Sequence, residues 1–481
     1  MKIRPTEGLT FDDVLLAPKR SSIASRSAVT TAAQLTRRLT LNIPILSSNM
    51  DTVTEAPMAI AMARAGGLGI IHRFMTIERQ AADVARVKRT ESYVVEAPAT
   101  IAPNASVRAA HELMDSDSIG GLLVVDRDGQ LLGMLTRRDI LLAPDPAATV
   151  ESVMTSRAKL ITATTETDLE TARHLLHAHR VEKLPLVDKQ SHVHGLITAQ
   201  DIIKLQEHPN ATKDSKGRLR VGAAVGTRAS DMERAAACVH AGVDVLVVDI
   251  AHGHADHALG MVRQLKQRFP EVDVIGGNVA TAEGVRDMAE AGADAVKVGV
   301  GAGSICITRI VTGFGVPQLT AVMDCAEAGR ALNLPTISDG GVRTSGDLTK
   351  ALAAGADTVM IGSLLAGTEE SPGASVIRDG RRFKVVRGMA SLTANVDRQE
   401  IEKGAELDPE DWDKVVPEGV EAVVPYRGNA ADVLHQLVGG LRSGLSYAGA
   451  TNIRELHANA EFIRMTAAGI RESGAHDVQK T

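Results

Sequence analysis

The sequence predicts an α/β fold in which a (β/α)₈ barrel is interrupted by a second, smaller α/β domain. Three observations point to it. From about residue 218 onward, short β-branched runs alternate with helical stretches rich in Ala, Glu and Arg, whereas residues 91–205 break this alternation. The chain, at 481 residues, is also long for a single barrel. We therefore expect residues 1–90 and 206–481 to form the barrel and residues 91–205 to form the inserted domain.

The predicted barrel strands are short and apolar. They are expected at residues 221–225, 243–250, 272–279, 295–300, 336–339 and 358–361. Strands that alternate with helices in this way are typical of a parallel sheet with right-handed crossovers. Because aromatic residues make up only 2% of the chain, Ala, Val, Ile and Leu must fill a core that is buried on both faces of the sheet.

Polar residues gather where these strands end. The carboxyl ends of barrel strands form one face, which is the catalytic face in barrel enzymes. We therefore expect one bowl to be lined by Asp249, Asn278, Cys306, Asp339 and Ser363.

Residues 91–205 contain an internal repeat. Each member of the set Val125-Asp126, Gly133 and Asp139-Ile140 recurs 62 residues later, as Val187-Asp188, Gly195 and Asp201-Ile202. A constant offset predicts two copies of one small α/β module that share a core. The pair resembles tandem cystathionine-β-synthase (CBS) modules, which in many proteins bind adenine or guanine nucleotides. The resemblance implies a regulatory purine nucleotide, and the alternative is a pair that only packs or mediates assembly.

A second irregular stretch spans residues 393–416. It holds Asp397-Arg398-Gln399 and an acidic run at residues 406–413. Long segments of this kind inside a compact domain are usually active-site lids or disordered. Because barrel-like sequence resumes at Pro417, we interpret the stretch as a mobile active-site flap.

Charge and hydropathy limit the class of partner. The net charge of −6 and the lack of Lys/Arg runs predict no nucleic acid and no anionic membrane as partner. No stretch approaches the roughly 18 uninterrupted apolar residues of a membrane span, and the polar start Met1-Lys2-Ile3-Arg4-Pro5 lacks the apolar part of a signal peptide. We expect a cytoplasmic protein that acts on a small molecule.

The loop after the strand at residues 295–300 carries the strongest chemical signal. It reads Gly299-Val300-Gly301-Ala302-Gly303-Ser304-Ile305-Cys306-Ile307-Thr308-Arg309. The three glycines allow the backbone to approach a phosphate or a cation closely. Cys306 is a candidate nucleophile, since neighbouring hydroxyls and Arg309 can favour the thiolate.

The other two cysteines are interpreted differently. Cys238 and Cys325 lie in Ala-rich helical contexts, where a cysteine usually acts as a small buried hydrophobe. An odd number of cysteines without zinc-type spacing predicts neither a disulfide framework nor a zinc site. His252, His254 and His257 follow Asp249 at a strand end, and we interpret them as hydrogen-bonding residues rather than metal ligands.

Two later strand ends suggest a nucleotide. In Asp339-Gly340-Gly341 the carboxylate can accept hydrogen bonds from two ribose hydroxyls. In Ile361-Gly362-Ser363 the amides and the hydroxyl can donate to a phosphate, as barrel enzymes often arrange after their late strands. Each motif alone is weak evidence, because a buried turn would use the same glycines. The order of the motifs along the chain is what indicates a nucleotide site.

With these motifs the chain is identified as a member of the inosine monophosphate dehydrogenase and guanosine monophosphate reductase superfamily of TIM-barrel oxidoreductases. The resemblance runs from residues 9–16 (LTFDDVLL) through Met50-Asp51-Thr52-Val53 and the Cys306 loop to residues 439–443. It implies an enzyme of purine metabolism in which Cys306 bonds covalently to C2 of a purine nucleoside 5′-monophosphate, with NADPH or NAD as hydride partner. A homotetramer, or an octamer paired through CBS modules, is also implied.

The resemblance further implies a set of site residues. The catalytic residues are Cys306, Thr308, Arg398 and Glu418. The nucleotide is held by Ser304, Asp339, Gly341, Gly362 and Ser363, with Gly388 and Met389 along the base. The cofactor-binding residues are Asp249, Gly299 and Gly301. The carbonyls that match a potassium site belong to Gly301, Gly303 and Cys306.

Four positions favour the reductase, which would convert guanosine monophosphate to inosine monophosphate through a Cys306 thioimidate. Dehydrogenases carry Asp-Arg-Tyr in the flap, where this chain has Gln399 in place of the tyrosine, and a further tyrosine where it has Val386. Asn49 matches the reductases, and Ala390 departs from the Gly-Met-Gly-Ser of the dehydrogenases. Because only dehydrogenases use the flap to activate water, these differences point away from hydrolysis.

Other features favour the NAD-dependent dehydrogenase, which makes xanthosine monophosphate. CBS modules are commoner there, and residues 417–421 (PEGVE) match its purine-contacting loop. Short reductases place a catalytic glutamate where this chain has Leu392, so the proton donor to ammonia is open, with Glu418 as the candidate. We favour the reductase. A catalytically silent CBS nucleotide sensor is disfavoured, because a sensor would not need Cys306.

Overall fold

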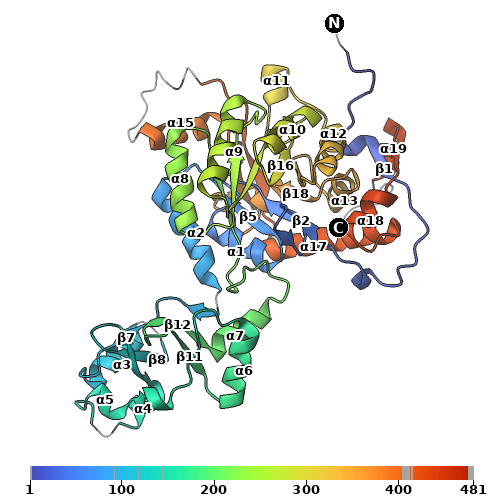
Figure 1. The fold of residues 1–481 in the computed structure, drawn as a ribbon. Helices are drawn as coiled ribbons and strands as arrows, with labels where there is room; N and C mark the ends of the chain where they lie inside the picture. Colours follow the sequence, from blue (N-terminus) through green and yellow to red (C-terminus); the bar gives the residue numbers. More distant parts are fainter. Residues whose placement is uncertain are drawn as a thin grey trace. The chain divides into compact units, whose positions relative to one another are not determined.

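The computed structural model describes residues 3–91, 93–116, 119–143, 145–403, 412 and 415–474. The chain divides into two compact units. The first comprises Met1–Lys88, Asn210–Thr212 and Leu219–Thr481, and the second comprises Arg89–Pro209 and Lys213–Arg218. Each unit has its own strands and helices (Figure 1).

The first unit is built on a closed barrel of parallel strands, in the order β13-β14-β15-β16-β17-β18-β4-β5. The predicted barrel is therefore confirmed. The strands are β4 (Ile45–Ser47), β5 (Leu68–Ile71), β13 (Gly222–Val225), β14 (Val245–Asp249), β15 (Asp273–Val279), β16 (Ala295–Val298), β17 (Thr336–Asp339) and β18 (Thr358–Ile361). The strand expected at residues 295–300 stops at Val298, because Gly299 turns the chain with φ of +153°.

Helices cover the outside of the barrel strands (Figure 1). They are α1 (Ala56–Arg64), α2 (Ile77–Thr90), α8 (Ala229–His240), α9 (Asp256–Arg268), α10 (Ala282–Glu290), α12 (Gln318–Ala331), α13 (Ser345–Ala353) and α17 (Ala430–Tyr447). Alternate strand residues such as Leu46, Ile70 and Val247 fill the barrel interior, and their neighbours pack against the helices. The aromatic-poor composition thus suits strands that are buried on both faces.

The second unit consists of two similar modules. The elements α3 (Val107–Ser116), β8 (Gly121–Val125), β9 (Leu131–Thr136) and α4 (Arg137–Leu141) begin 62 residues before α6 (Leu169–His179), β11 (Lys183–Val187), β12 (Val193–Thr198) and α7 (Ala199–Glu207). One sheet has the order β10-β9-β8-β7 and the other β11-β12-β6. The short strands are β6 (Val94–Val95), β7 (Thr100–Ile101) and β10 (Thr155–Ser156). Leu123 and Leu131 of one module pack with Val187 and Leu196 of the other.

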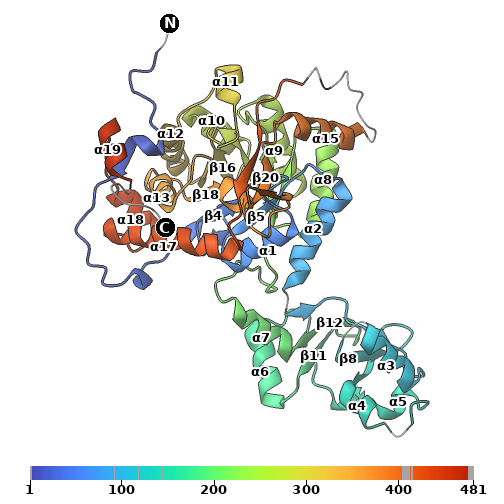
Figure 2. The same cartoon turned by 180° about the vertical axis from the view of Figure 1, so that it is seen from behind.

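A small antiparallel sheet extends from the barrel unit. It contains β19 (Ser375–Arg378), β20 (Arg381–Arg387) and β21 (Glu421–Pro425). Helix α15 (Leu392–Lys403) lies in the chain between β20 and β21 (Figure 2). The expectation of an irregular stretch is therefore wrong for residues 393–403, which are helical. This run lacks Gly and Pro, so nothing in it opposes a helix. Residues 404–411 and 413–414 of the predicted flap lie outside the described residues.

The remaining elements are short. They are η1 (Phe11–Asp13), β1 (Val14–Leu16), η2 (Arg26–Ala28), β2 (Ala33–Gln34), β3 (Thr40–Leu41), α5 (Val150–Val153), η3 (Arg157–Lys159), α11 (Thr308–Thr312), α14 (Ser363–Ala366), α18 (Ile453–Asn459), β22 (Phe462–Arg464) and α19 (Ala467–Glu472). Strand β1 pairs with β22 and thereby joins the two ends of the barrel unit. Among the helices that the structure describes, none has the length and apolarity to cross a membrane.

Asp357, directly before β18, makes stability depend on pH. Its Oδ2 accepts a hydrogen bond from the Thr336 amide at 2.8 Å, yet burial raises the pKa of Asp357 to about 6. The carboxyl of an unfolded chain titrates near 3.9. Between about pH 4 and pH 6 the folded state therefore binds more protons, and the free energy of unfolding falls as the pH rises.

We expect Asp357→Asn to remove this dependence, because an amide carries no charge to bury. Relative to wild type, the variant gains about 1–2 kcal/mol between pH 4.5 and pH 7.5. Thermal unfolding of both proteins at the two pH values measures the gain. An equal difference at both values would contradict the assignment.

Candidate active site

The loop after β16 and the segment that precedes β21 lie side by side. The Ile307 amide donates to the Glu418 carbonyl at 2.8 Å, and the Val420 amide donates to the Ile305 carbonyl at 3.0 Å. Within the loop, the Cys306 amide donates a hydrogen bond to the Gly303 carbonyl at 3.1 Å. These backbone hydrogen bonds hold Glu418 beside the Cys306 loop, although the two are more than a hundred residues apart in the sequence.

Cys306, Thr308 and Glu418 form a chain of side-chain contacts. The Sγ atom of Cys306 lies 3.2 Å from Thr308 Oγ1, and the Thr308 hydroxyl donates to Glu418 Oε2 at 2.8 Å. The thiol is half-buried. A thiol proton therefore has a hydrogen-bonded path to a carboxylate, which is what an activated cysteine nucleophile needs. The sequence predicted these three residues as catalytic, and the structure brings them together.

The other two cysteines sit in helices away from this chain of contacts. Cys238 in α8 and Cys325 in α12 are both buried, as predicted. Burial raises the pKa of each thiol to about 12, so both stay protonated at neutral pH. Neither can serve as a thiolate nucleophile.

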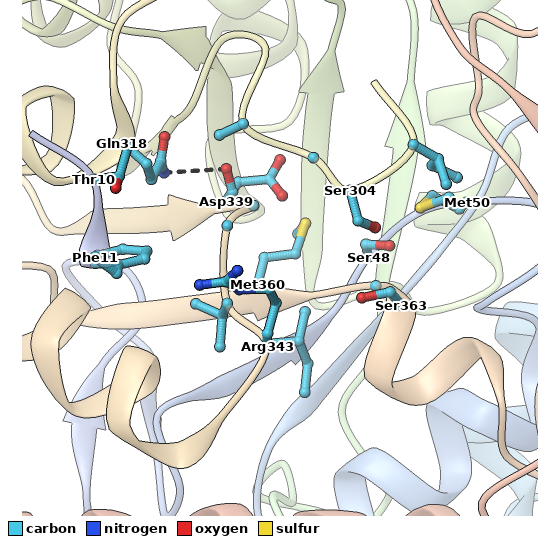
Figure 3. Close-up of a pocket in the computed structure, with 18 of the residues that line it drawn as sticks. Thr10, Phe11, Ser48, Met50, Ser304, Gln318, Asp339, Arg343, Met360 and Ser363 are labelled. Carbon is cyan, nitrogen blue, oxygen red and sulfur yellow. Dashed lines mark hydrogen bonds between the residues drawn. The ribbon is translucent and has the colours of Figure 1, made fainter. Parts of the chain in front are cut away.

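A pocket of about 280 Å³ opens beside the Cys306 loop (Figure 3). Five of the residues predicted to hold a nucleotide line it, namely Ser304, Asp339, Gly341, Gly362 and Ser363. In Figure 3 the hydroxyls of Ser304 and Ser363 lie toward one end and Asp339 toward the other. Gly388 and Met389 are not among the lining residues. The backbone of Gly388 instead runs against Gly419, behind the Cys306 loop.

Several pocket residues were not predicted from the sequence. They are Phe11, Ser48, Met50, Arg343 and Met360, together with Thr10 and Gln318. Gln318 fixes the end of β17, because its Nε2 donates to the Asp339 carbonyl at 3.1 Å. Thr10, Phe11 and Met50 belong to motifs that carry the family resemblance, but no role in a pocket followed from them, because they reach it only through tertiary folding.

A buried lysine lies beneath the polar strand ends. The ammonium of Lys297, in β16, contacts Asp249 Oδ1 at 2.6 Å and Asp339 Oδ2 at 2.7 Å, and it also donates to Asn278. Burial alone would lower the pKa of Lys297, but the two carboxylates outweigh it and raise the pKa. Lys297 was not predicted as a site residue, although the sequence shows it as a single charged residue inside the apolar run Ala295–Val298.

Asp249 is held from two sides. Burial would raise the pKa of Asp249, yet Lys297 and a hydrogen bond from Asn49 Nδ2 to Oδ2, at 2.7 Å, hold it below its usual value. The carboxylate therefore stays ionised at the end of β14. Asn49 is one of the positions at which the sequence resembles the reductases.

The chain has relatives among proteins of known function. Residues 8–476 match the family model described as the IMP dehydrogenase / GMP reductase domain. The chain belongs to this family. It is 54% identical over 472 residues to inosine-5′-monophosphate dehydrogenase of Nitrosopumilus maritimus, and 98% of each chain is covered. It is 51% identical over 483 residues to GMP reductase of Leishmania donovani, again with 98% of each chain covered.

A solved structure is similar over nearly the whole chain. It is a cysteine-to-alanine variant of GMP reductase from Trypanosoma brucei in complex with guanosine 5′-monophosphate, with a TM-score of 0.86, 48% identity and 98% of each chain covered. The family consists of oxidoreductases of purine nucleotides that use a nicotinamide cofactor. Both reactions occur among relatives at similar identity, so the choice between them must come from the site.

Three further residues singled out in the sequence have defined surroundings in the structure. Arg398 projects from α15, with its guanidinium carbon 5.9 Å from the centre of the Phe74 ring. His254 pairs with Asp287, its Nε2 lying 2.7 Å from Oδ2, which agrees with a hydrogen-bonding role. Val386, at the position of the dehydrogenase tyrosine, is buried with 1% exposure. Its side chain lines the same pocket, but because it is apolar it offers no hydrogen-bonding group to a phosphate.

Gly299, which follows β16, is expected to tolerate no side chain. A Cβ atom at this position would lie 2.1 Å from the carbonyl oxygen of Asp339, a backbone atom that cannot rotate away. In Gly299→Ala either β17 or the Cys306 loop must shift. We expect a loss of about 3 kcal/mol in unfolding free energy, together with weaker nucleotide binding. Thermal unfolding and calorimetric titration measure the two effects.

Gly380→Ala is the matched control for that substitution, because a Cβ atom there meets nothing within 4 Å. Gly380 also has a positive φ, of +72°, so the control carries a backbone penalty without the clash. If both variants were equally stable and bound nucleotide equally well, the close approach to Asp339 would be unimportant.

Proposed function

We propose that the protein is a guanosine monophosphate reductase that deaminates guanosine monophosphate to inosine monophosphate with NADPH. The observation that carries the proposal is the hydrogen-bonded chain from Cys306 through Thr308 to Glu418. It supplies the proton donor to ammonia that is missing at Leu392. Glu418 lies on the segment that pairs with the Cys306 loop, and its carboxylate accepts the hydrogen bond from Thr308. It would therefore serve the leaving group without help from the flap.

The nucleotide occupies the pocket beside the Cys306 loop. Asp339 accepts hydrogen bonds from the ribose hydroxyls, while Ser304, Gly341, Gly362 and Ser363 hold the phosphate. Gly388 and Met389 lie along the base. The Trypanosoma brucei structure, solved with guanosine 5′-monophosphate, supports this choice of ligand.

The first step joins Cys306 to the purine. The thiol passes its proton through Thr308 to Glu418, and the thiolate attacks C2 of guanosine monophosphate. The C2–N2 bond then breaks, and the proton held by Glu418 returns through Thr308 to the nitrogen, which leaves as ammonia. The product of this half-reaction is a thioimidate on Cys306. The thioimidate is the acceptor for the hydride that a bound nicotinamide cofactor would supply at C2, and Cys306 would then leave as the thiolate to give inosine monophosphate.

The nicotinamide cofactor would be held by Asp249, Gly299 and Gly301, and when bound it supplies the hydride. The residues fit this task, because Lys297 and Asn49 fix both oxygens of Asp249 at the rim of the barrel. Backbone carbonyls of Gly301, Gly303 and Cys306 are hard oxygen donors that suit potassium. The Gly303 carbonyl already accepts one hydrogen bond, and it keeps a second lone pair for a cation.

The alternative is an NAD-dependent inosine monophosphate dehydrogenase. Arg398 favours it, since the flap arginine that would activate water is present in α15. Gln399 and the buried Val386 stand in place of the two tyrosines, so the reductase remains the better supported reaction.

The second unit is proposed to be a tandem CBS pair that binds a regulatory purine nucleotide. Its two modules repeat one local hydrogen bond, from the hydroxyls of Thr136 and Thr198 to Asp139 and Asp201, at 2.7 and 2.6 Å. Titration calorimetry of the Cys306→Ala protein with adenosine or guanosine triphosphate tests this assignment, since the variant excludes turnover. No heat with either nucleotide would leave the pair as a packing or assembly element.

One absorbance experiment separates the reactions. The purified protein is given guanosine monophosphate with NADPH in one cuvette and inosine monophosphate with NAD in another. A fall in the reduced-nicotinamide band of the first, with ammonia released, is the expected result. A rise of this band in the second cuvette, with no fall in the first, would establish the dehydrogenase. No change in either cuvette would favour the interpretation as a catalytically silent nucleotide sensor.

A further inference from the structure

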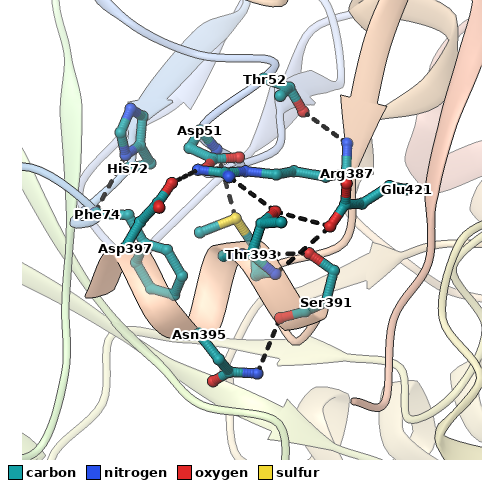
Figure 4. A network of polar contacts seen from close by, with 12 residues as sticks. Asp51, Thr52, His72, Phe74, Arg387, Ser391, Thr393, Asn395, Asp397 and Glu421 are labelled. Atoms are coloured by element: carbon teal, nitrogen blue, oxygen red, sulfur yellow. Dashed lines mark hydrogen bonds and ion pairs between the residues drawn. The ribbon is translucent and has the colours of Figure 1, made fainter. Parts of the chain in front are cut away.

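The guanidinium of Arg387, at the end of β20, joins the helix α15 that follows it in the chain to the distant loop after β4 (Figure 4). Its Nε lies 2.7 Å from Oδ2 of Asp51, in the loop after β4. Its Nη2 lies 2.6 Å from Oδ2 of Asp397 in α15, and its Nη1 donates to Thr393 Oγ1 at 2.9 Å. The planar fork of an arginine allows all three contacts at once.

The Arg387 cluster reaches the segment of the predicted catalytic residue Glu418 and the turn of the predicted base-contacting residue Met389. The Thr393 hydroxyl donates at 2.7 Å to Glu421, three residues beyond Glu418. The Asp51 amide donates to the Met389 sulfur at 3.4 Å. One side chain therefore ties α15, the Glu418 segment and the Met389 turn to a loop of the barrel.

The two ion pairs of Arg387, with Asp51 and with Asp397, differ in how far they are exposed to solvent. Asp51 is 7% exposed and Asp397 is 46% exposed. A half-exposed ion pair contributes little to global stability. Stability of the fold therefore does not explain the Arg387–Asp397 contact. Because Asp397 lies on α15, the contact instead holds this helix against the barrel.

We propose that Arg387 is a positioning residue that docks α15 onto the barrel through Asp397 and so aligns the Glu418 segment for turnover. This inference rests on the proposed function for its catalytic part. Arg387 itself is set apart from the reacting atoms, and it acts through Asp397, Thr393 and Glu421.

Asp397→Asn tests the proposal with the least risk to folding, because it removes only the outer pair. We expect kcat to fall about tenfold and the KM for the nucleotide to change by less than about twofold. Amide hydrogen exchange in residues 392–401 should become faster, while the melting temperature stays near that of wild type. Glu327→Gln, an exposed carboxylate on α12, is the matched control and should change neither kcat nor exchange.

A double-mutant cycle with Arg387→Lys completes the test. Lysine keeps the charge but lacks the planar fork that reaches Asp51, Thr393 and Asp397 together, so we expect the double variant to be no slower than Arg387→Lys alone. Additive losses, unchanged exchange in α15, or an equal loss of nucleotide affinity in Asp397→Asn would each overturn the positioning role. The kinetics are measured in whichever direction wild type reacts, and the exchange needs no turnover. A failure of the proposed reductase reaction is thereby distinguished from a failure of this inference.

Discussion

Replacing Cys306 with alanine is expected to abolish turnover while leaving nucleotide binding almost unchanged. The variant lacks the thiol that lies on the hydrogen-bonded path to Glu418, so no covalent adduct forms. The pocket residues that are proposed to hold ribose and phosphate do not include Cys306. A loss of roughly 10⁴-fold or more in kcat is expected when a covalent nucleophile is removed.

The measurement combines the absorbance assay with calorimetric titration of the nucleoside 5′-monophosphate. Cys325→Ala is the matched control, because it makes the same substitution in α12, where the thiol is buried. It should retain activity at a temperature where its fold is intact. Near wild-type rates in Cys306→Ala would refute covalent catalysis, whereas lost nucleotide affinity would show that the thiol mainly shapes the pocket.

Glu418→Gln is expected to lower kcat by about 10²- to 10³-fold, with little change in the KM for the nucleotide. The glutamine oxygen can still accept the bond from Thr308, so the contact that orders the loop survives. The amide, however, cannot carry the proton from Cys306 to the departing ammonia. Single-turnover measurements of ammonia release report this step directly.

Thr308→Val gives an independent check, since it breaks the same path in its middle. If the path acts as a unit, the double variant should be about as slow as the slower single variant. Multiplicative losses would mean that the two residues serve separate steps. Normal ammonia release in Glu418→Gln would require another proton donor.

The alternating sequence pattern located six of the eight barrel strands, because their signal is local, but it did not give β4 and β5. The strands at residues 336–339 and 358–361 were predicted with their observed bounds, since a turn residue marks each end. The helix α15 was missed, because Asp397-Arg398-Gln399 and the acidic run after it suggested a loop, although residues 392–403 contain no helix breaker. Motif resemblance proposed the residues of the site, but it could not give their distances.

The residues that sequence reasoning missed are those whose partners come from elsewhere in the chain. Arg387 precedes a recognised motif, yet its partners Asp51 and Asp397 lie in other elements. The Thr308–Glu418 contact likewise spans 110 residues and depends on the backbone pairing beside the Cys306 loop. Such contacts are set by tertiary packing, which a single sequence does not reveal.

Lys297 gives the two proposed binding sites a common counter-ion. Asp249, on the cofactor side, and Asp339, on the ribose side, are neutralised by the same buried ammonium. If one carboxylate were lost, the other would bind the lysine alone, with a different charge balance for its own ligand. A substitution at Asp249 or at Asp339 therefore changes the charge balance at the other aspartate. We expect Asp249, Asp339 and Lys297 to be conserved together among related enzymes.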